Sequence, residues 1–243
     1  MKVLSIGNSF SQDAHKWLHT LAKQNEISVE TINLYIGGCS LQTHWKNAVE
    51  NNAAYDLEIN GGECVRKISI DEALKLNKFD VVTFQQRSGH SGILETYFPY
   101  LSNLDIVVRE LQPDAKIMFH QTWAYEKDSA HKDYENYNSN QEQMFAAIID
   151  ASQKAAQEID AEIIPTGTVI QKLRKTIKDF DYSNGGISLC RDGFHLSHDY
   201  GRYAAAATWI RALTHKNVKA EQFEDFDTQL LQKIVKTVNS VVK

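Results

Sequence analysis

The sequence predicts an α/β fold in which a parallel sheet lies between two layers of helices. Short segments rich in β-forming residues alternate with segments whose apolar residues recur at helical spacing. Glycine-containing or polar loops follow several of the strand segments. No linker composition and no internal repeat divides the 243 residues, so one three-layer domain over residues 1–243 is expected.

In the N-terminal half, strands are predicted where β-formers cluster and helices where apolar residues recur every three or four positions. These elements are a strand at 2–6 ended by Gly7, a helix at 11–23, a strand at 27–36 ended by Gly37-Gly38, a helix at 40–51, a small hairpin near 55–70 and a strand at 79–84. Ser11 is expected to cap the first helix, and Asp13 suits its first turn because a negative charge there complements the helix dipole.

The C-terminal half continues the alternation of strands and helices. Its elements are a helix within 94–111, a strand at 115–119, an Ala-rich helix at 141–159, a strand at 161–164, a helix at 168–177, a long ordered loop at 179–197, and helices at 200–213 and 223–242. Five strands connected through helices predict a parallel sheet, and ligands bind such sheets at the carboxyl ends of the strands.

Composition excludes several classes of protein. Hydrophobic residues make up 42% and charged residues 23%, which is ordinary for a globular protein, and the net charge is −5. No basic cluster and no membrane-length apolar run occurs, so neither nucleic acid nor a membrane is an expected partner. The odd number of cysteines (Cys39, Cys64 and Cys190) without a C-x-x-C motif argues against a disulfide framework and a zinc site. The N-terminal apolar run is too short for a signal peptide, which predicts an intracellular protein.

Ser9 lies in the loop after the first strand and directly before the first helix. A helix start offers free backbone N–H groups and a positive dipole end, which favour the oxyanion that develops during acyl transfer. The competing interpretation is that Ser9 is only a turn or capping residue. Two other loops could supply donors: Gly37 and Gly38 let a backbone N–H approach a ligand, and the Gln85 and Gln86 amides can donate to an oxyanion.

A second candidate pair lies near the other end of the chain, in Arg191-Asp192-Gly193-Phe194-His195. Asp192 and His195 are three residues apart, so the carboxylate can hold the imidazole while the ring faces a serine. His195 and His198 are also at a metal-ligand spacing, which makes a metal-dependent hydrolase an alternative.

Together these loops resemble the SGNH/GDSL hydrolases over nearly the whole chain. Gly7-Asn8-Ser9-Phe10-Ser11 is similar to the first sequence block of that superfamily, with Asn where its name has Asp, and Asp192-Gly193-Phe194-His195 is similar to its last block. The motifs are closer to those of a bacterial branch, here I-G-N-S-F-S, I-G-G-C-S, Q-Q-R-S, H-Q-T-W-A-Y, P-T-G-T-V-I-Q and R-D-G-F-H-L-S.

The resemblance implies a flavodoxin-like α/β/α sandwich with a five-stranded parallel sheet. It implies Ser9 as nucleophile, His195 as general base and Asp192 as the residue that orients the base. The oxyanion hole would consist of the Ser9 and Gly38 N–H groups and the Gln86 side chain, with Gly37 and Gln85 as rivals, because the asparagine of the third block is missing. Residues expected to contact substrate are Asn8, His120, Trp123 and Tyr125, although Trp123 could equally be a core residue.

The function that follows is a serine esterase that needs neither cofactor nor metal. Short acyl esters are the expected substrates, with acetyl groups on carbohydrate as the favoured case by family analogy. The alternatives are a thioesterase or lysophospholipase-type lipase with the same triad, and a non-catalytic binding protein that keeps the fold.

Overall fold

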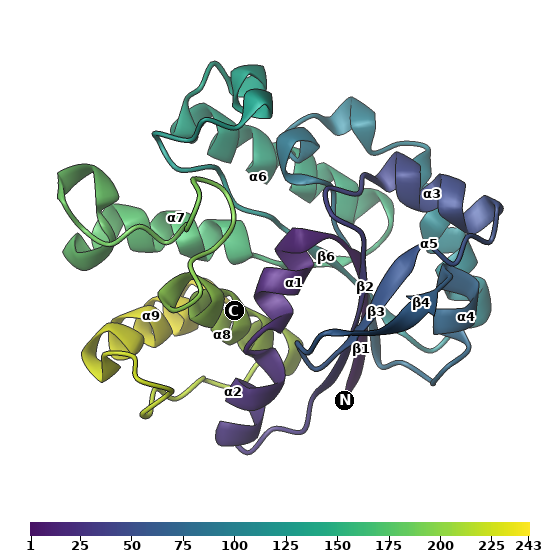
Figure 1. Cartoon of the computed structure of the whole chain (residues 1–243), viewed down its shortest axis with the longest axis horizontal. Helices are drawn as coiled ribbons and strands as arrows, with labels where there is room; N and C mark the ends of the chain where they lie inside the picture. Colours follow the sequence, from purple (N-terminus) through teal and green to yellow (C-terminus); the bar gives the residue numbers. More distant parts are fainter.

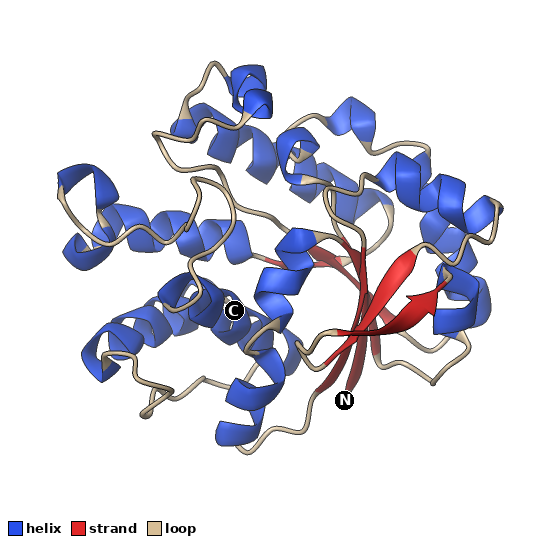
Figure 2. Ribbon diagram, in the orientation of Figure 1, coloured by secondary structure: helices blue, strands red, loops and turns tan.

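A seven-stranded sheet lies between two layers of helices in the computed structural model, which describes residues 1–243 (Figures 1 and 2). The strands are β1 (Lys2–Gly7), β2 (Glu30–Tyr35), β3 (Tyr55–Ile59), β4 (Cys64–Ile68), β5 (Val81–Phe84), β6 (Lys116–His120) and β7 (Glu162–Ile164). Their spatial order is β4-β3-β2-β1-β5-β6-β7.

The sheet is mixed, which corrects the prediction of a five-stranded parallel sheet. Five strands, β2-β1-β5-β6-β7, are parallel, and the hairpin β3–β4 adds two antiparallel strands beside β2. The hairpin joins the sheet because β3 is amphipathic. Its Tyr55 and Leu57 pack into the core, and Leu57 pairs with Leu34 of β2.

The helices connect the strands and cover both faces of the sheet. They are α1 (Ser9–His15), α2 (Leu18–Gln24), α3 (Leu41–Val49), α4 (Ile70–Leu74), α5 (Tyr100–Leu111), α6 (Gln141–Glu158), α7 (Thr166–Thr176), α8 (Tyr200–Thr214) and α9 (Thr228–Val241). Short 3₁₀ helices are η1 (Ser88–His90), η2 (Leu94–Thr96), η3 (Lys132–Tyr137), η4 (Lys178–Phe180) and η5 (Tyr182–Asn184). None of the helices combines the length and the apolar character needed to cross a membrane.

The observed helices differ from the predicted ones most clearly near the two ends of the chain. The helix predicted at 11–23 starts at Ser9 and is broken into α1 and α2 at Trp17, whose indole Nε1 donates to the His198 carbonyl at 3.0 Å. The last helix begins at Thr228 because the Asp227 side chain accepts from the Gln229 N–H. The short helix α4 was not predicted.

Hydrophobic clusters lie on both faces of the sheet: β1, β5 and β6 supply side chains to both, whereas β2 supplies Ile32 and Leu34 to one of them. In β1, Val3 belongs to the cluster shared with α1, α2, α7, α8 and α9, whereas Leu4 and Ile6 belong to the cluster shared with α3, α4 and α5. Helix α6 packs at the border and contributes to both clusters, with Met144 in the first and Ala151 in the second. The carboxyl ends of the five parallel strands lie along one edge of the sheet, where the loops that follow them are brought together.

Three histidines are completely buried within these layers. His15 Nε2 lies 2.8 Å from Ser5 Oγ, His44 Nδ1 lies 2.9 Å from Tyr55 OH, and His120 Nδ1 lies 2.6 Å from a glutamine oxygen. Burial lowers the pKa of each of these rings to about 3. They are therefore neutral in the folded protein at every pH above that value.

These rings predict that stability falls as the pH is lowered from about 6.5 toward 3. An unfolded histidine takes up a proton near pH 6.5 and the folded one does not, so each ring lowers the free energy of unfolding with a slope that reaches at most about 1.4 kcal/mol per pH unit within this interval. Urea unfolding at pH 7, 6 and 5 measures the slope. His44→Gln should flatten the slope relative to that of the wild type. An equal slope in His44→Gln and wild type would contradict the assignment.

Candidate active site

Ser9 is the first residue of α1, at the carboxyl end of the central strand β1. Asn8 caps the helix: its Oδ1 accepts from the Phe10 N–H at 3.0 Å, and the Asn8 N–H donates to Ser11 Oγ at 3.1 Å. Because of this reciprocal cap, the helix begins at Ser9, and Asn8 takes the capping position that was predicted for Ser11. The Ser9 N–H therefore points out of the helix end without an acceptor in the protein.

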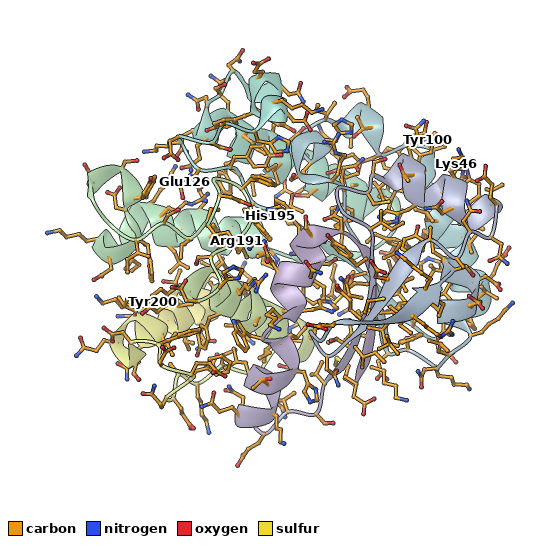
Figure 3. The ribbon with its side chains drawn as sticks, in the orientation of Figure 1. Lys46, Tyr100, Glu126, Arg191, His195 and Tyr200 are labelled. Carbon is orange, nitrogen blue, oxygen red and sulfur yellow. The ribbon has the colours of Figure 1, made fainter.

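The structure brings Asp192 and His195 to Ser9, although the histidine and the serine are 186 residues apart. His195 Nε2 lies 3.0 Å from Ser9 Oγ, and His195 Nδ1 lies 2.7 Å from Asp192 Oδ2. Figure 3 shows His195 and Arg191 on the loop before α8, beside α1. The His195 side chain is 21% exposed, so a small molecule can reach the pair from solvent.

The Asp192 carboxylate is held in its ionised form. Burial raises its pKa, but hydrogen bonds from the His195 ring and from the backbone N–H groups of His195 and Phe194 outweigh burial, so the pKa lies below its usual value. The ionised carboxylate accepts the Nδ1 proton of His195. This tautomer leaves Nε2 with a free lone pair toward the Ser9 hydroxyl, which is the arrangement that a general base requires.

Hydrogen bonds hold the loop that carries Asp192 and His195 in place. Some lie within the loop, and others come from the segment after β6. The Arg191 N–H donates to the His195 carbonyl at 2.9 Å, inside a β-bridge between Cys190 and Leu196. From the segment after β6, Trp123 Nε1 donates to the Phe194 carbonyl at 2.7 Å and the Glu126 N–H donates to the Gly193 carbonyl at 2.7 Å. The loop predicted as long and ordered at 179–197 therefore has a defined conformation.

Asn8 also links the loop that carries Ser9 to the loops after β2 and β5. This structural role differs from the expected contact between Asn8 and the substrate. Asn8 Nδ2 donates to the Cys39 carbonyl at 3.0 Å, and Asn8 Oδ1 accepts from Gln85 Nε2 at 2.6 Å. Gln85 Oε1 in turn accepts from His120 Nδ1, and His120 Nε2 lies 3.0 Å from Thr166 Oγ1. Asn8, Gln85 and His120 are all buried, so this chain of hydrogen bonds supports the serine loop from below.

Gln86 is not free to donate to an oxyanion, in contrast to the prediction. Its Nε2 group donates to the carbonyl and to the hydroxyl of Thr96, at 3.0 and 3.1 Å, which uses both amide hydrogens. Its Oε1 accepts from the N–H groups of Leu41 and Arg87. Gln86 therefore joins three loops as a buried structural residue. Its rival Gln85 is likewise buried and turned toward Asn8.

His120, Trp123 and Tyr125 were expected to line a substrate pocket, but all three side chains are buried. The Trp123 ring stacks on Phe10 with centroids 4.1 Å apart, and Tyr125 OH lies 2.8 Å from Ser88 Oγ. A buried side chain cannot touch a bound molecule without a rearrangement of its neighbours. These residues form the floor beneath the triad, because the strand β6 runs into the core before its loop reaches the surface.

Of the two glycines after β2, Gly38 has the special backbone. Its φ is +63°, in the left-handed region that favours glycine, and a Cβ there would meet no atom within 4 Å. The Gly38 N–H has no acceptor in the protein, and the residue is exposed on the same edge as Ser9. Gly37 lacks a positive φ, which makes Gly38 the better candidate for a ligand-binding N–H.

The side chains that tie the loop of Asp192 and His195 to α1 were not predicted. Asp13 was predicted to lie in the first turn of the helix, but it lies beyond the first turn of α1, is fully buried and binds Arg191 and Arg202. No group of three or more His, Cys, Asp or Glu has an arrangement suited to a metal ion. The cysteines at 39 and 190 are buried thiols whose pKa burial raises to about 12, so they are poor nucleophiles.

Comparison with known proteins places this geometry in a wider context. The model of one protein family, described as a domain of unknown function (DUF4886), matches residues 2–237. The crystal structure of a DUF4886 family protein from Bacteroides uniformis is similar, with 37% identity and a TM-score of 0.91 over 100% of this chain and 94% of that chain. No curated protein matches the sequence.

Two more distant solved structures share the fold. One is a protein assigned to the SGNH hydrolases from Slackia heliotrinireducens, with 19% identity and a TM-score of 0.60 over 88% of this chain and 98% of that chain. The other is a variant of an acetylxylan esterase from Geobacillus stearothermophilus, with 14% identity and a TM-score of 0.53 over 90% of this chain and 97% of that chain. At these identities the likeness concerns the fold, which is that of the SGNH hydrolases.

Proposed function

Since the chain belongs to the DUF4886 family and has the fold of the SGNH hydrolases, we propose that it is a serine hydrolase of carboxylic esters. The observation that carries this proposal is the hydrogen-bonded series from Ser9 Oγ through His195 to Asp192, with distances of 3.0 and 2.7 Å. A nucleophile, a base and a group that orients the base are the parts that acyl transfer needs. A protein that only binds a ligand has no use for this alignment.

In the proposed mechanism, His195 Nε2 takes the proton of the Ser9 hydroxyl as Oγ attacks the ester carbonyl. Asp192 stabilises the imidazolium that forms and keeps its ring oriented. The tetrahedral intermediate collapses when His195 gives the proton to the leaving alcohol, and an acyl-serine remains. Water, activated by the same histidine, attacks the acyl-serine and releases the acid and free Ser9.

The proposed oxyanion hole consists of two backbone N–H groups, those of Ser9 and Gly38. Both lack an acceptor in the protein, and the Ser9 N–H lies at the positive end of α1. The bond from Asn8 Nδ2 to the Cys39 carbonyl fixes the glycine loop relative to the serine. Neither Gln85 nor Gln86 has a role as donor in this proposal, because both amides serve other residues.

We further propose a short acyl group on a hydroxyl-rich alcohol as the substrate. A cavity of about 430 Å³ lies between α1 and the β3–β4 hairpin, and Gln12, one turn after Ser9, lines it with Tyr35 and Glu58. Ser9, His195 and Gly38 do not line this cavity, so in this proposal it holds part of the alcohol and not the reacting ester bond. Such a polar lining suits hydroxyl groups better than a fatty chain. The acetylxylan esterase that shares the fold acts on an acetylated carbohydrate by its name. A lipase or thioesterase would instead favour p-nitrophenyl decanoate over p-nitrophenyl acetate.

Ser9→Ala should reduce kcat for p-nitrophenyl acetate by roughly 10⁴-fold or more, because the reaction loses its nucleophile. Asp192→Asn should also lower kcat but should keep more activity than Ser9→Ala, because the nucleophile and the base both remain. Ser183→Ala, at an exposed serine, is the matched control and should behave as the wild type. Steady-state kinetics on the four proteins measures this, and equal rates for wild type and Ser9→Ala would refute the proposal.

The oxyanion assignment predicts a separate effect at Gly38. Gly38→Ala places a side chain at φ +63°, which strains the loop by about 1–2 kcal/mol and moves the N–H. The expected result is at least a tenfold loss of kcat/KM. Gly185→Ala is the control, since Gly185 also has a positive φ and open space around its Cα. It should lose similar stability but keep its activity. Equal kcat/KM values in the two variants would contradict the role of Gly38.

A further inference from the structure

Asp13 is a fully buried carboxylate that binds three groups from two other segments of the chain. Arg191 Nη1 donates to its two oxygens at 3.0 and 3.1 Å, Arg202 Nε donates to Oδ1 at 2.8 Å, and the Leu196 N–H donates to Oδ2 at 2.9 Å. Asp13 has no exposed surface, and Arg202 is only 13% exposed. We call Asp13 with these three partners the Asp13 clasp.

The members of the clasp stand next to the three residues of the candidate triad. Asp13 follows Ser9 by four positions, so both side chains lie on the same face of α1. Arg191 precedes Asp192, and Leu196 follows His195 directly. The clasp therefore joins the helix that carries the nucleophile to both ends of the segment that carries the base.

The Asp13 clasp ties the loop of Asp192 and His195 to α1 and α8, whereas the other contacts of this loop tie it to a different part of the fold. The hydrogen bonds from Trp123 and Glu126 fasten the loop to the segment after β6. Arg202 belongs to α8, so through Asp13 the helices α1 and α8 and the loop between them share one buried anion. In this low-dielectric surrounding, charged hydrogen bonds have fixed lengths and directions, which suits a spacing that must be kept.

We infer that Asp13 is a positioning residue, which sets the distance between Ser9 Oγ and His195 Nε2 without touching the substrate. The inference rests on the proposed serine mechanism. Proton transfer from Ser9 to His195 requires hydrogen-bond contact between them, and a displacement of about 1 Å can lower a rate by about 100-fold. The aspartate therefore acts on the turnover step and has little influence on substrate binding.

Asp13→Asn keeps the shape of the side chain but removes its charge, and it should lower kcat for p-nitrophenyl acetate about 10- to 100-fold with KM changed less than threefold. Asp13→Glu restores the charge and should recover part of the lost kcat. The matched control is Asp105→Asn on α5, because Asp105 is also a buried helical aspartate paired with an arginine, Arg109, on the opposite face of the sheet. It should lower the melting temperature as well but leave kcat within twofold.

Two additional measurements keep the test decisive. If Asp13→Asn does not fold, Arg202→Gln leaves Asp13 paired with Arg191 and should lower kcat severalfold. Crystal structures of wild type and Asp13→Asn report the Ser9 Oγ–His195 Nε2 distance independently of activity, and the variant should exceed 3.5 Å.

The outcomes separate the two proposals. A wild type without esterase activity refutes the proposed function, and the crystal structures then decide whether Asp13 sets the spacing. An active wild type whose Asp13→Asn variant keeps its kcat, or loses no more than Asp105→Asn, overturns the positioning role. An unchanged Ser9–His195 distance in the variant overturns it as well.

Discussion

The Asn8 side chain is the contact on which the geometry of the site depends. Its oxygen caps α1 and accepts from Gln85, and its nitrogen binds the Cys39 carbonyl. One amide therefore sets where the helix begins, how the Ser9 N–H is directed and how far the glycine loop lies from it. Because Asn8 is buried and its oxygen accepts two hydrogen bonds, alternative positions of the loop would leave buried polar groups unpaired.

Buried hydrogen bonds also fix the positions of the residues that lie beneath the site. His120, Gln85 and Thr166 extend the hydrogen bonding of Asn8 into the sheet, while Trp123 stacks on Phe10 and donates to the loop of His195. Satisfied buried polar groups of this kind make a site rigid, at the cost of sensitivity to acid. Few residues of the candidate site are exposed to solvent, and many buried residues fix the orientation of their side chains. The few reactive side chains are therefore held in place by a larger set of buried, hydrogen-bonded residues.

The sequence predicted the positions of the five parallel strands along the chain, and it singled out Ser9, Asp192 and His195, because these features have local signals. A strand followed by a glycine turn, and a D-x-x-H spacing, can be read over a few residues. The orientation of Gln86 and Tyr125 could not be read in this way, because whether a side chain after a strand turns inward depends on neighbouring loops. Asp13 gave no signal, since its partners Arg191 and Arg202 lie 178 and 189 residues away. The hairpin was predicted, but its pairing with β2 was not, because this pairing depends on which strand lies at the edge of the parallel sheet.

The central claim is that His195 activates Ser9 as a nucleophile. Reaction with a fluorophosphonate, followed by peptide mapping by mass spectrometry, tests it without any assumption about the natural ester, because only an activated serine is phosphonylated at an appreciable rate. We expect one adduct in the wild type, located on Ser9, and almost none in His195→Ala. An adduct on another serine, or equal labelling of Ser9 in His195→Ala, would contradict it.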